Sequence, residues 1–415
     1  MSQTASAVSR DRADELRAAM ADKLVADGWI ASPDVERAFR AVPRHLFTLP
    51  GSPLDDAYHH NKAPYVKVGD DGRPTSTVSA AWLQARMIAQ AHVRPGMRVL
   101  EVGSGGYNAA LLSEVTGPDG QVVTMDVDPD ITSHAEAALD AAGYAGRVEV
   151  VTGDGEDGVP SRAPFDAVIV TVGAWDLPPA WTAQLAPGGT LVVPLRIGTI
   201  SRSIGFRKDR GRLVSESWEK CGFVPMTGAG GHQGASVDLH GPDGGRVSLT
   251  FDQDPPSDPR LLEGALSTPQ AEAWSGKMIP PNISFDGLVQ WLPAFAPGFC
   301  RVNASEGTEL HDQGREWKPF GLVDGDSFAC LALRRVDAPA GDGHAYEFGA
   351  KAYGLRAAAA AAALVAQVHA WDYRELAQDA FTFWPAGTST GPLPPLTSSF
   401  PKAHGTVTVT WPAAP

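Results

Sequence analysis

Apolar runs and helical segments alternate through the middle of the chain. The apolar runs lie at residues 99–102, 122–126, 148–152 and 165–171, with helical spacing between them near 108–115 and 131–142. Continuous apolar strands separated by helices are typical of a mainly parallel sheet that is covered on both faces. A further strand at 190–195 and a closing antiparallel hairpin over 204–214 complete the unit. The pattern predicts an α/β, doubly wound, Rossmann-like domain.

The segments before this domain have helical spacing, except for one polar stretch. Residues 11–26 and 34–39 predict short helices, and Ser79–Ala91 predicts another, with Thr77 or Ser79 as its cap. Residues 50–75 are rich in Pro, Gly, Asp and His and predict a loop, where function is more common than in regular elements.

After residue 231 the alternation gives way to short β-like runs, prolines and aromatic residues. Strands are expected at 247–251, 328–336 and 406–411, and a long helix at 353–376. The sequence therefore predicts three parts, in which residues 1–95 are N-terminal helices and a substrate loop, 96–231 are the cofactor-binding domain, and 232–415 are a second, α+β domain. Its aromatic residues suit contact with a peptide.

Composition narrows the possible partners and compartment. The chain has 34 Lys and Arg against 48 Asp and Glu, a net charge of −14, which argues against nucleic-acid binding. Three scattered cysteines and the absence of a signal-like or membrane-length apolar run favour the cytoplasm and no membrane contact. No metal-ligand spacing is present, so we expect no metal site.

The most informative stretch is Arg98–Asn108, in which a strand runs into a glycine-rich turn. Side chains at Gly103, Gly105 and Gly106 would block a ligand from the backbone, and the helix that follows points its amide end at the ligand. Asp126 closes the next strand, where doubly wound sheets place a carboxylate on a ribose. The spacing differs from the dinucleotide fingerprint. A strand that ends with an acidic residue, a compact glycine turn and an acidic end to the next strand resembles S-adenosyl-L-methionine-dependent methyltransferases, so NAD is the minor alternative.

Two further segments carry candidate chemistry. Gly153-Asp154-Gly155 follows the third strand, where a carboxylate and an open amide suit an adenine edge, although Asp-Gly is also a common turn. The hydroxyls of residues 75–79 suit either helix capping or the binding of a substrate carboxylate.

These segments, taken in order, resemble the protein-L-isoaspartate O-methyltransferase family. The resemblance rests on residues 42–47, 77–79, 99–108, 153–155, 164–166, 185–189 and 223–228, and spans roughly residues 30 to 228. It implies a class I methyltransferase with S-adenosyl-L-methionine as cofactor. It also implies that Ser79, with Thr77, is the active-site position, that Asp126 binds the ribose and that Asp154 lies beside the adenine.

The predicted site residues follow from the turn and the resemblance together. The cofactor set comprises Glu101, Gly103, Ser104, Gly105, Gly106, Asn108, Asp126, Val127, Asp154 and Gly155. The substrate set comprises Val78, from the resembling 77–79 segment, and His59 and His60, from the loop at 50–75. The two histidines are expected either to gate the pocket or bind the peptide, or to be inert loop residues.

Departures from the family pattern shape the expected substrate. The glycine turn is contracted, Ala80 replaces the usual proline, and an extra region follows. These departures resemble the FxLD-type branch found with lanthipeptide clusters. That branch implies esterification of an aspartate in a ribosomally made, modified precursor peptide, leading through a succinimide to isoaspartate. The alternatives are isoaspartate repair, methylation of a small metabolite, and a silent peptide-binding module.

Overall fold

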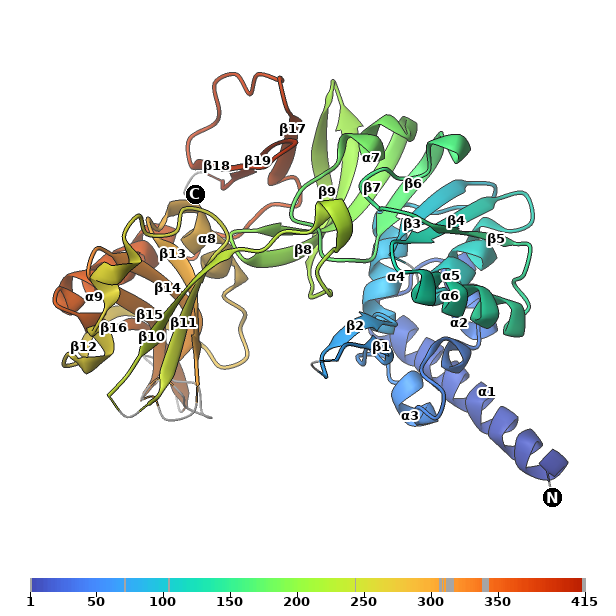
Figure 1. Cartoon of the computed structure of the whole chain (residues 1–415), viewed down its shortest axis with the longest axis horizontal. Helices are drawn as coiled ribbons and strands as arrows, with labels where there is room; N and C mark the ends of the chain where they lie inside the picture. The colour runs from blue at the N-terminus through green and yellow to red at the C-terminus, as the bar shows by residue number, and fades with distance from the viewer. Residues whose placement is uncertain are drawn as a thin grey trace.

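The computed structural model describes residues 2–70, 72–103, 105–242, 244–305, 308, 310, 317–337 and 343–412. Its strands form a ten-stranded sheet, a seven-stranded sheet and a small hairpin. Figure 1 shows two lobes, with the ten-stranded sheet extending from the N-terminal lobe toward the C-terminal one.

Five parallel strands form the half of the ten-stranded sheet that follows the predicted doubly wound pattern. They are β3 (Arg98–Val102), β4 (Gln121–Asp126), β5 (Val148–Thr152), β6 (Phe165–Val170) and β7 (Leu185–Ile197). Their order is β5-β4-β3-β6-β7, and β8 (Ile200–Asp209) and β9 (Arg212–Lys220) continue the sheet antiparallel. The Rossmann-like α/β prediction and the closing hairpin are confirmed.

The two faces of this sheet are buried differently. Val99, Ala167 and Ile169 pack against helices, whereas Leu100 and Val168, one position away, belong to a second core on the other face. This is the period-two alternation of a strand buried on both sides. The helices of the first core are α1 (Ser2–Ala26), α2 (Pro33–Ala41), α4 (Ala81–Gln90), α5 (Tyr107–Thr116) and α6 (Pro129–Ala141); α7 (Pro179–Ala183) lies in the second.

The seven-stranded sheet is antiparallel throughout. In sheet order it consists of β10 (Ala235–His240), β11 (Arg246–Phe251), β13 (Phe299–Ala304), β14 (Trp317–Asp324), β15 (Ser327–Asp337), β16 (His344–Gly354) and β12 (Ala271–Ile279). Helices α8 (Asp286–Phe295) and α9 (Ala357–Trp371) pack together beside it. Over the ranges that the structure describes, no helix is long and apolar enough to cross a membrane.

The end of the chain returns to the first sheet. Strands β17 (Phe381–Pro385), β19 (Gly405–Thr410) and β18 (Thr397–Pro401) extend the ten-stranded sheet beyond β9, with Phe383 opposite Leu213. The second core is continuous from β3 and β6 to α8, α9 and Trp411. The domain boundary expected at residue 231 therefore falls between the two sheets, except that β17–β19 join the first one. The second core extends across this boundary, so the division into two domains stays a proposal.

Three local predictions were wrong. The helix expected at 353–376 is the shorter α9, because β16 continues through Gly354. The loop expected at 50–75 contains α3 (Leu54–Ala57) and most of a hairpin, β1 (Tyr65–Val68) and β2 (Pro74–Thr77). The helix expected from Ser79 begins at Ala81, and its N-cap, Ala80, has no side chain that could cap it.

Candidate active site

The turn after β3 requires glycine at two positions. Gly103 has φ +97°, and a Cβ there would lie 2.8 Å from Val172 Cγ1. Gly106 has φ +82°, and its Cβ would lie 3.1 Å from Phe47 Cδ1. Both the backbone angles and the close neighbours exclude larger residues. The strand therefore ends in a bare backbone turn, directly before α5.

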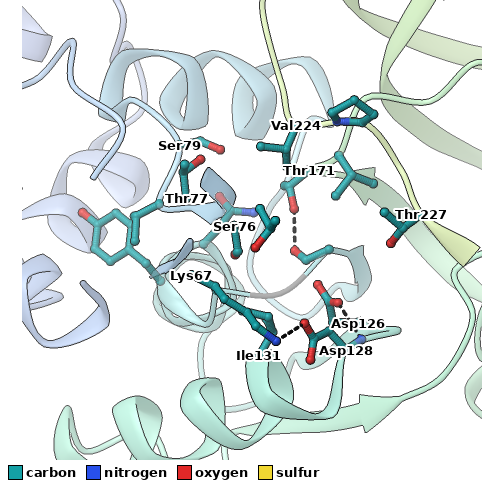
Figure 2. Close-up of a pocket in the computed structure, with 18 of the residues that line it drawn as sticks. Lys67, Ser76, Thr77, Ser79, Asp126, Asp128, Ile131, Thr171, Val224 and Thr227 are labelled. Atoms are coloured by element: carbon teal, nitrogen blue, oxygen red, sulfur yellow. Dashed lines mark hydrogen bonds and ion pairs between the residues drawn. The ribbon is translucent and has the colours of Figure 1, made fainter. Parts of the chain in front are cut away.

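This turn forms the floor of a cavity of about 420 Å³ at the carboxyl ends of β3, β4 and β6. That volume lies in the range of small-molecule sites, and the position is where open α/β sheets bind ligands. Figure 2 shows Thr77 and Ser79 on one side of the cavity and Asp126 and Asp128 on another. The β1–β2 hairpin, the first turns of α5 and α6, and Val224, Pro225 and Thr227 also line the cavity.

The wall that carries Ser79 is held by a buried cation, Arg44. Its side chain is fully buried and its guanidinium lies 4.8 Å from the centre of the Tyr107 ring. One Nη donates to the carbonyls of Ser79 (2.8 Å) and Val78 (3.2 Å), and the other donates to Gln84 Oε1 (2.8 Å). Charge-assisted bonds of this kind fix the backbone of the segment.

These bonds explain why Ser79 is not a helix cap. The amide of Val78 donates to the Pro64 carbonyl at 2.8 Å while Arg44 binds the carbonyls of Val78 and Ser79, so the backbone stays outside the helix until Ala81. Among the described residues the Ser79 hydroxyl makes no hydrogen bond, and Ser79 lines the cavity. Thr77, at the end of β2, and Val78 line it as well.

The opposite wall is acidic and is tied to the β1–β2 hairpin. Asp126 ends β4, and its Oδ1 accepts the amide of Asp128 at 3.0 Å. Lys67, on β1, bridges Asp128 (2.6 Å) and Asp130 (2.7 Å), and these bonds raise the pKa of Lys67. The hairpin is thus fastened at the edge of the cavity, across from the segment that holds Ser79.

Two buried polar side chains occupy the start of α5 and the end of β3. Glu101 is buried, accepts the Thr124 hydroxyl at 2.6 Å, and burial raises its pKa to about 7. Asn108 is 5% exposed, and neither atom of its side-chain amide has a hydrogen-bond partner among the described residues. Both line the cavity. Unsatisfied buried polar atoms are costly, so the Asn108 amide favours a polar ligand, and the Glu101 carboxylate favours a cationic one.

The other predicted residues lie in different places. Gly105 lines the main cavity, while Val127 and Gly155 line a smaller apolar slot that shares Gly103 and Asp126 with it. Gly106 supports the turn through its contact with Phe47. Ser104 lies outside the described residues.

Asp154 and the two histidines do not line either cavity. The Asp154 carboxylate accepts the amides of Glu156 (2.9 Å) and Ala229 (2.8 Å), so it holds the loop that follows residue 227. His59 and His60 stack on each other with ring centres 5.0 Å apart. The roles expected for these three residues stay predictions.

Sequence reasoning missed several cavity residues. Lys67, Gln84 and Thr171 line the cavity, and Thr171 donates to the Gly103 carbonyl and so supports the turn. The sequence includes Arg44 in the resembling segment 42–47 but predicts no role for it. An arginine inside an apolar motif was the available signal, because a buried guanidinium needs several acceptors.

A sequence model of the protein-L-isoaspartate(D-aspartate) O-methyltransferase family matches residues 15–231, just over half of the chain. The chain belongs to this family. The family's enzyme from Hyperthermus butylicus is 38% identical over 223 residues, which are 52% of this chain and 89% of that protein. The enzyme from Methanopyrus kandleri is 36% identical over 219 residues, which are 52% and 93%.

Solved structures of the same family align with the fold. A protein-L-isoaspartate O-methyltransferase aligns with a TM-score of 0.49 and 23% identity, over 88% of this chain and 95% of that one. A putative family member from Plasmodium falciparum, in complex with S-adenosyl-L-homocysteine, aligns with a TM-score of 0.44 and 18% identity, over 51% and 98%.

The protein is therefore an O-methyltransferase whose cofactor is S-adenosyl-L-methionine. The cavity residues fit this cofactor. The bare turn at Gly103 admits the ligand to the backbone, and Asp126 is placed for ribose hydroxyls. Buried Glu101 and the unpartnered amide of Asn108 suit the cationic amino-acid part.

Proposed function

We propose that the protein transfers a methyl group to the carboxylate of an isoaspartyl residue in a protein or peptide. The observation that carries this proposal is that the Ser79 segment, fixed by Arg44, and the glycine turn after β3 line the same cavity. The matched relatives are named for the isoaspartate reaction, which favours what the sequence offered only as an alternative.

In this reaction the protein mainly orients the acceptor carboxylate toward the methyl group and does not need to move a proton. When bound, the cofactor supplies a methyl group on a positively charged sulfur. The acceptor carboxylate is ionised at neutral pH, so no base is needed. We assign Ser79 the task of holding and aiming that carboxylate through its unused hydroxyl, and Thr77 a supporting contact. Orientation in an enclosed cavity supplies several kcal/mol.

Arg44 is a positioning residue in this scheme. It does not line the cavity, and its donors are occupied by backbone carbonyls and Gln84. Its charge therefore fixes the peptide planes beside Ser79. Misplacing that hydroxyl by about 1 Å is enough to slow a transfer about a hundredfold.

The ester product has a defined chemical fate. The neighbouring backbone amide attacks the ester carbonyl, methanol leaves, and a succinimide forms. Hydrolysis of the succinimide gives aspartate or isoaspartate. We propose that the protein acts in this cycle in the cytoplasm, consistent with its three free cysteines.

A second candidate keeps the site and changes the substrate. In it, the acceptor is an aspartate in a ribosomally made, modified precursor peptide. Residues 232–415, which lie beyond the family match, favour it because they help to line a second cavity. The names of the relatives favour the isoaspartyl substrate, so the precursor peptide ranks second.

Mass spectrometry of three peptides with S-adenosyl-L-methionine tests the proposal. One peptide contains isoaspartate, one contains aspartate in the same sequence, and one is a constrained macrocycle containing aspartate. We expect a methyl ester, or the succinimide that follows it, on the isoaspartyl peptide alone. Modification of the macrocycle alone would establish the second candidate, and modification of none would exclude both.

A further inference from the structure

A second cavity, of about 540 Å³, lies between the methyltransferase region and the C-terminal region. We call it the interdomain cleft. Residues of the β7–β8 turn and of 220–223 line one side, and residues of β11, β13 and β14 line the other. Phe223 lines the cleft, while Val224 and Pro225, the next two residues, line the catalytic cavity. One segment thus adjoins both cavities, and Figure 2 shows its Val224 at the edge of the catalytic cavity.

The charge of this cleft is opposite to that of the whole chain. Three cationic side chains, Arg196, Lys220 and Arg301, line it together with one carboxylate, Asp252. The chain as a whole carries −14. A positive cleft on an acidic protein concentrates anionic ligands locally while the rest of the surface repels them.

Among the residues that the structure describes, only one of these cations lacks a counter-charge. Arg196 Nε lies 2.8 Å from Asp252 Oδ1, and Lys220 Nζ lies 2.9 Å from Asp286 Oδ1. Arg301 has no ion pair and no side-chain hydrogen bond within the described part of the chain. It lies on β13 opposite Thr250, half-buried, and burial lowers its pKa. A partly dehydrated guanidinium without a partner is stabilised by an anionic ligand.

A second polar atom in the cleft also lacks a partner. Thr199 Oγ1 is buried and makes no hydrogen bond with the described residues. Thr199 is also β-branched and yet has φ +69°. Strained residues of this kind gather at ligand sites. Phe223 and Phe320 add apolar side chains to the lining of the cleft.

We propose that the interdomain cleft binds an acidic side chain of the same peptide that is methylated in the catalytic cavity, with Arg301 as its ion-pair partner. This inference rests on the proposed function. The peptide is favoured over a free anion because the segment 223–225 joins the cleft to the catalytic cavity, so one extended chain reaches both. The enzyme then prefers acceptors that carry a nearby Asp or Glu.

Methyl-transfer kinetics on a peptide series tests this preference. Each isoaspartyl peptide carries one Glu, moved outward one position at a time on either side of the acceptor, and is paired with a Gln peptide. At one or more positions we expect the Glu peptide to have a KM about tenfold lower, with kcat unchanged. Arg301→Gln removes this difference and Arg301→Lys retains part of it, while inorganic phosphate weakens Glu-peptide binding only slightly.

The matched control is Arg335→Gln, which removes an exposed arginine on β15 of the same region. It should leave the Glu preference intact. Equal KM values for Glu and Gln at every position, or an Arg301→Gln enzyme that keeps the preference, would overturn the inference while leaving the proposed function standing. Strong competition by phosphate would replace the peptide with a free anion and overturn it as well.

If no peptide is methylated, the proposed function fails, and the inference about the cleft is then tested by peptide binding instead of methyl transfer. Fluorescence anisotropy of the labelled Glu and Gln peptides then supports the cleft if Glu binds more tightly and Arg301→Gln abolishes the difference. Equal affinities overturn it.

Discussion

The two regions of this protein bury their strands in different ways. In residues 15–231, the parallel strands are covered on both faces. The residues that line the main cavity lie at the carboxyl ends of these strands, along one edge of the sheet. In residues 232–415, antiparallel strands cover a core rich in aromatic residues, and the last three return to the first sheet. The first region carries the catalytic cavity, and the second supports its sheet and completes the cleft.

The relatives sharpen this contrast. The enzymes from Hyperthermus butylicus and Methanopyrus kandleri align over about nine-tenths of their own length with about half of this chain. The family fold therefore exists without the added region. In this protein, β17 covers the edge of β9, and Phe381, Phe383 and Trp411 share the core of the methyltransferase sheet. The C-terminal region therefore shares both a sheet and a core with the methyltransferase region.

Shortening the chain to residues 1–231 gives the largest expected effect. It removes β17–β19 and exposes the apolar side chains of the second core, which favours aggregation. We expect loss of cooperative thermal unfolding and poor solubility. A soluble fragment that unfolds cooperatively and binds the cofactor as tightly as the full chain would show that the regions are independent.

Arg44→Met tests the positioning of the Ser79 segment. It leaves the carbonyls of Val78 and Ser79 without their donor, so we expect a loss of about 3 kcal/mol in the free energy of unfolding. Methyl transfer should fall more than cofactor affinity. Urea unfolding and single-turnover kinetics measure the two effects.

Arg37→Met is the matched control for Arg44. Arg37 is exposed on α2 and pairs with Asp34 at 2.6 Å, so its loss should change stability by less than about 1 kcal/mol. Equal effects of the two variants would contradict the account.

Cofactor affinity should depend on pH through Glu101. Burial raises its pKa to about 7, and a cationic ligand prefers the ionised form. Affinity should therefore rise up to about tenfold as the pH increases from about 6 to 7.5, and Glu101→Gln should bind weakly with a flat profile. Calorimetric titration measures both, and a flat profile for the natural protein would remove Glu101 from this role.

His404 offers the finest test of how the added region affects the cofactor site. Its Nε2 lies 2.6 Å from Glu156 Oε1, one residue from Gly155 in the apolar slot. His404→Ala should weaken cofactor binding about threefold, because a half-exposed pair contributes under about 1 kcal/mol. His240→Ala, at an exposed position on β10, is the control. Equal cofactor affinities for the two variants would show that the added region does not influence the slot.

Sequence patterns predicted what lies close together in the chain. The β3 strand, the glycines at 103 and 106 and the acidic end of β4 follow from neighbouring residues, and the structure brings them to one cavity. No local pattern predicts a role for Arg44, because its acceptors lie far along the chain; Gln84, for example, is 40 residues away. The pairing of Thr382 with Val214 joins strands whose partners no local pattern specifies. The sequence predicts that Asp154 follows a strand, but it does not predict that its carboxylate binds the amides of Glu156 and Ala229.

The central claim is that the Ser79 hydroxyl aims the acceptor carboxylate at a cofactor held by the turn after β3. Single-turnover methyl transfer to an isoaspartyl peptide, with the cofactor bound beforehand, tests it in the natural protein and in Ser79→Ala. Ser76→Ala, which removes another hydroxyl from the same wall, is the control. We expect Ser79→Ala to be about tenfold to a hundredfold slower with unchanged cofactor affinity. An unchanged rate would contradict the account.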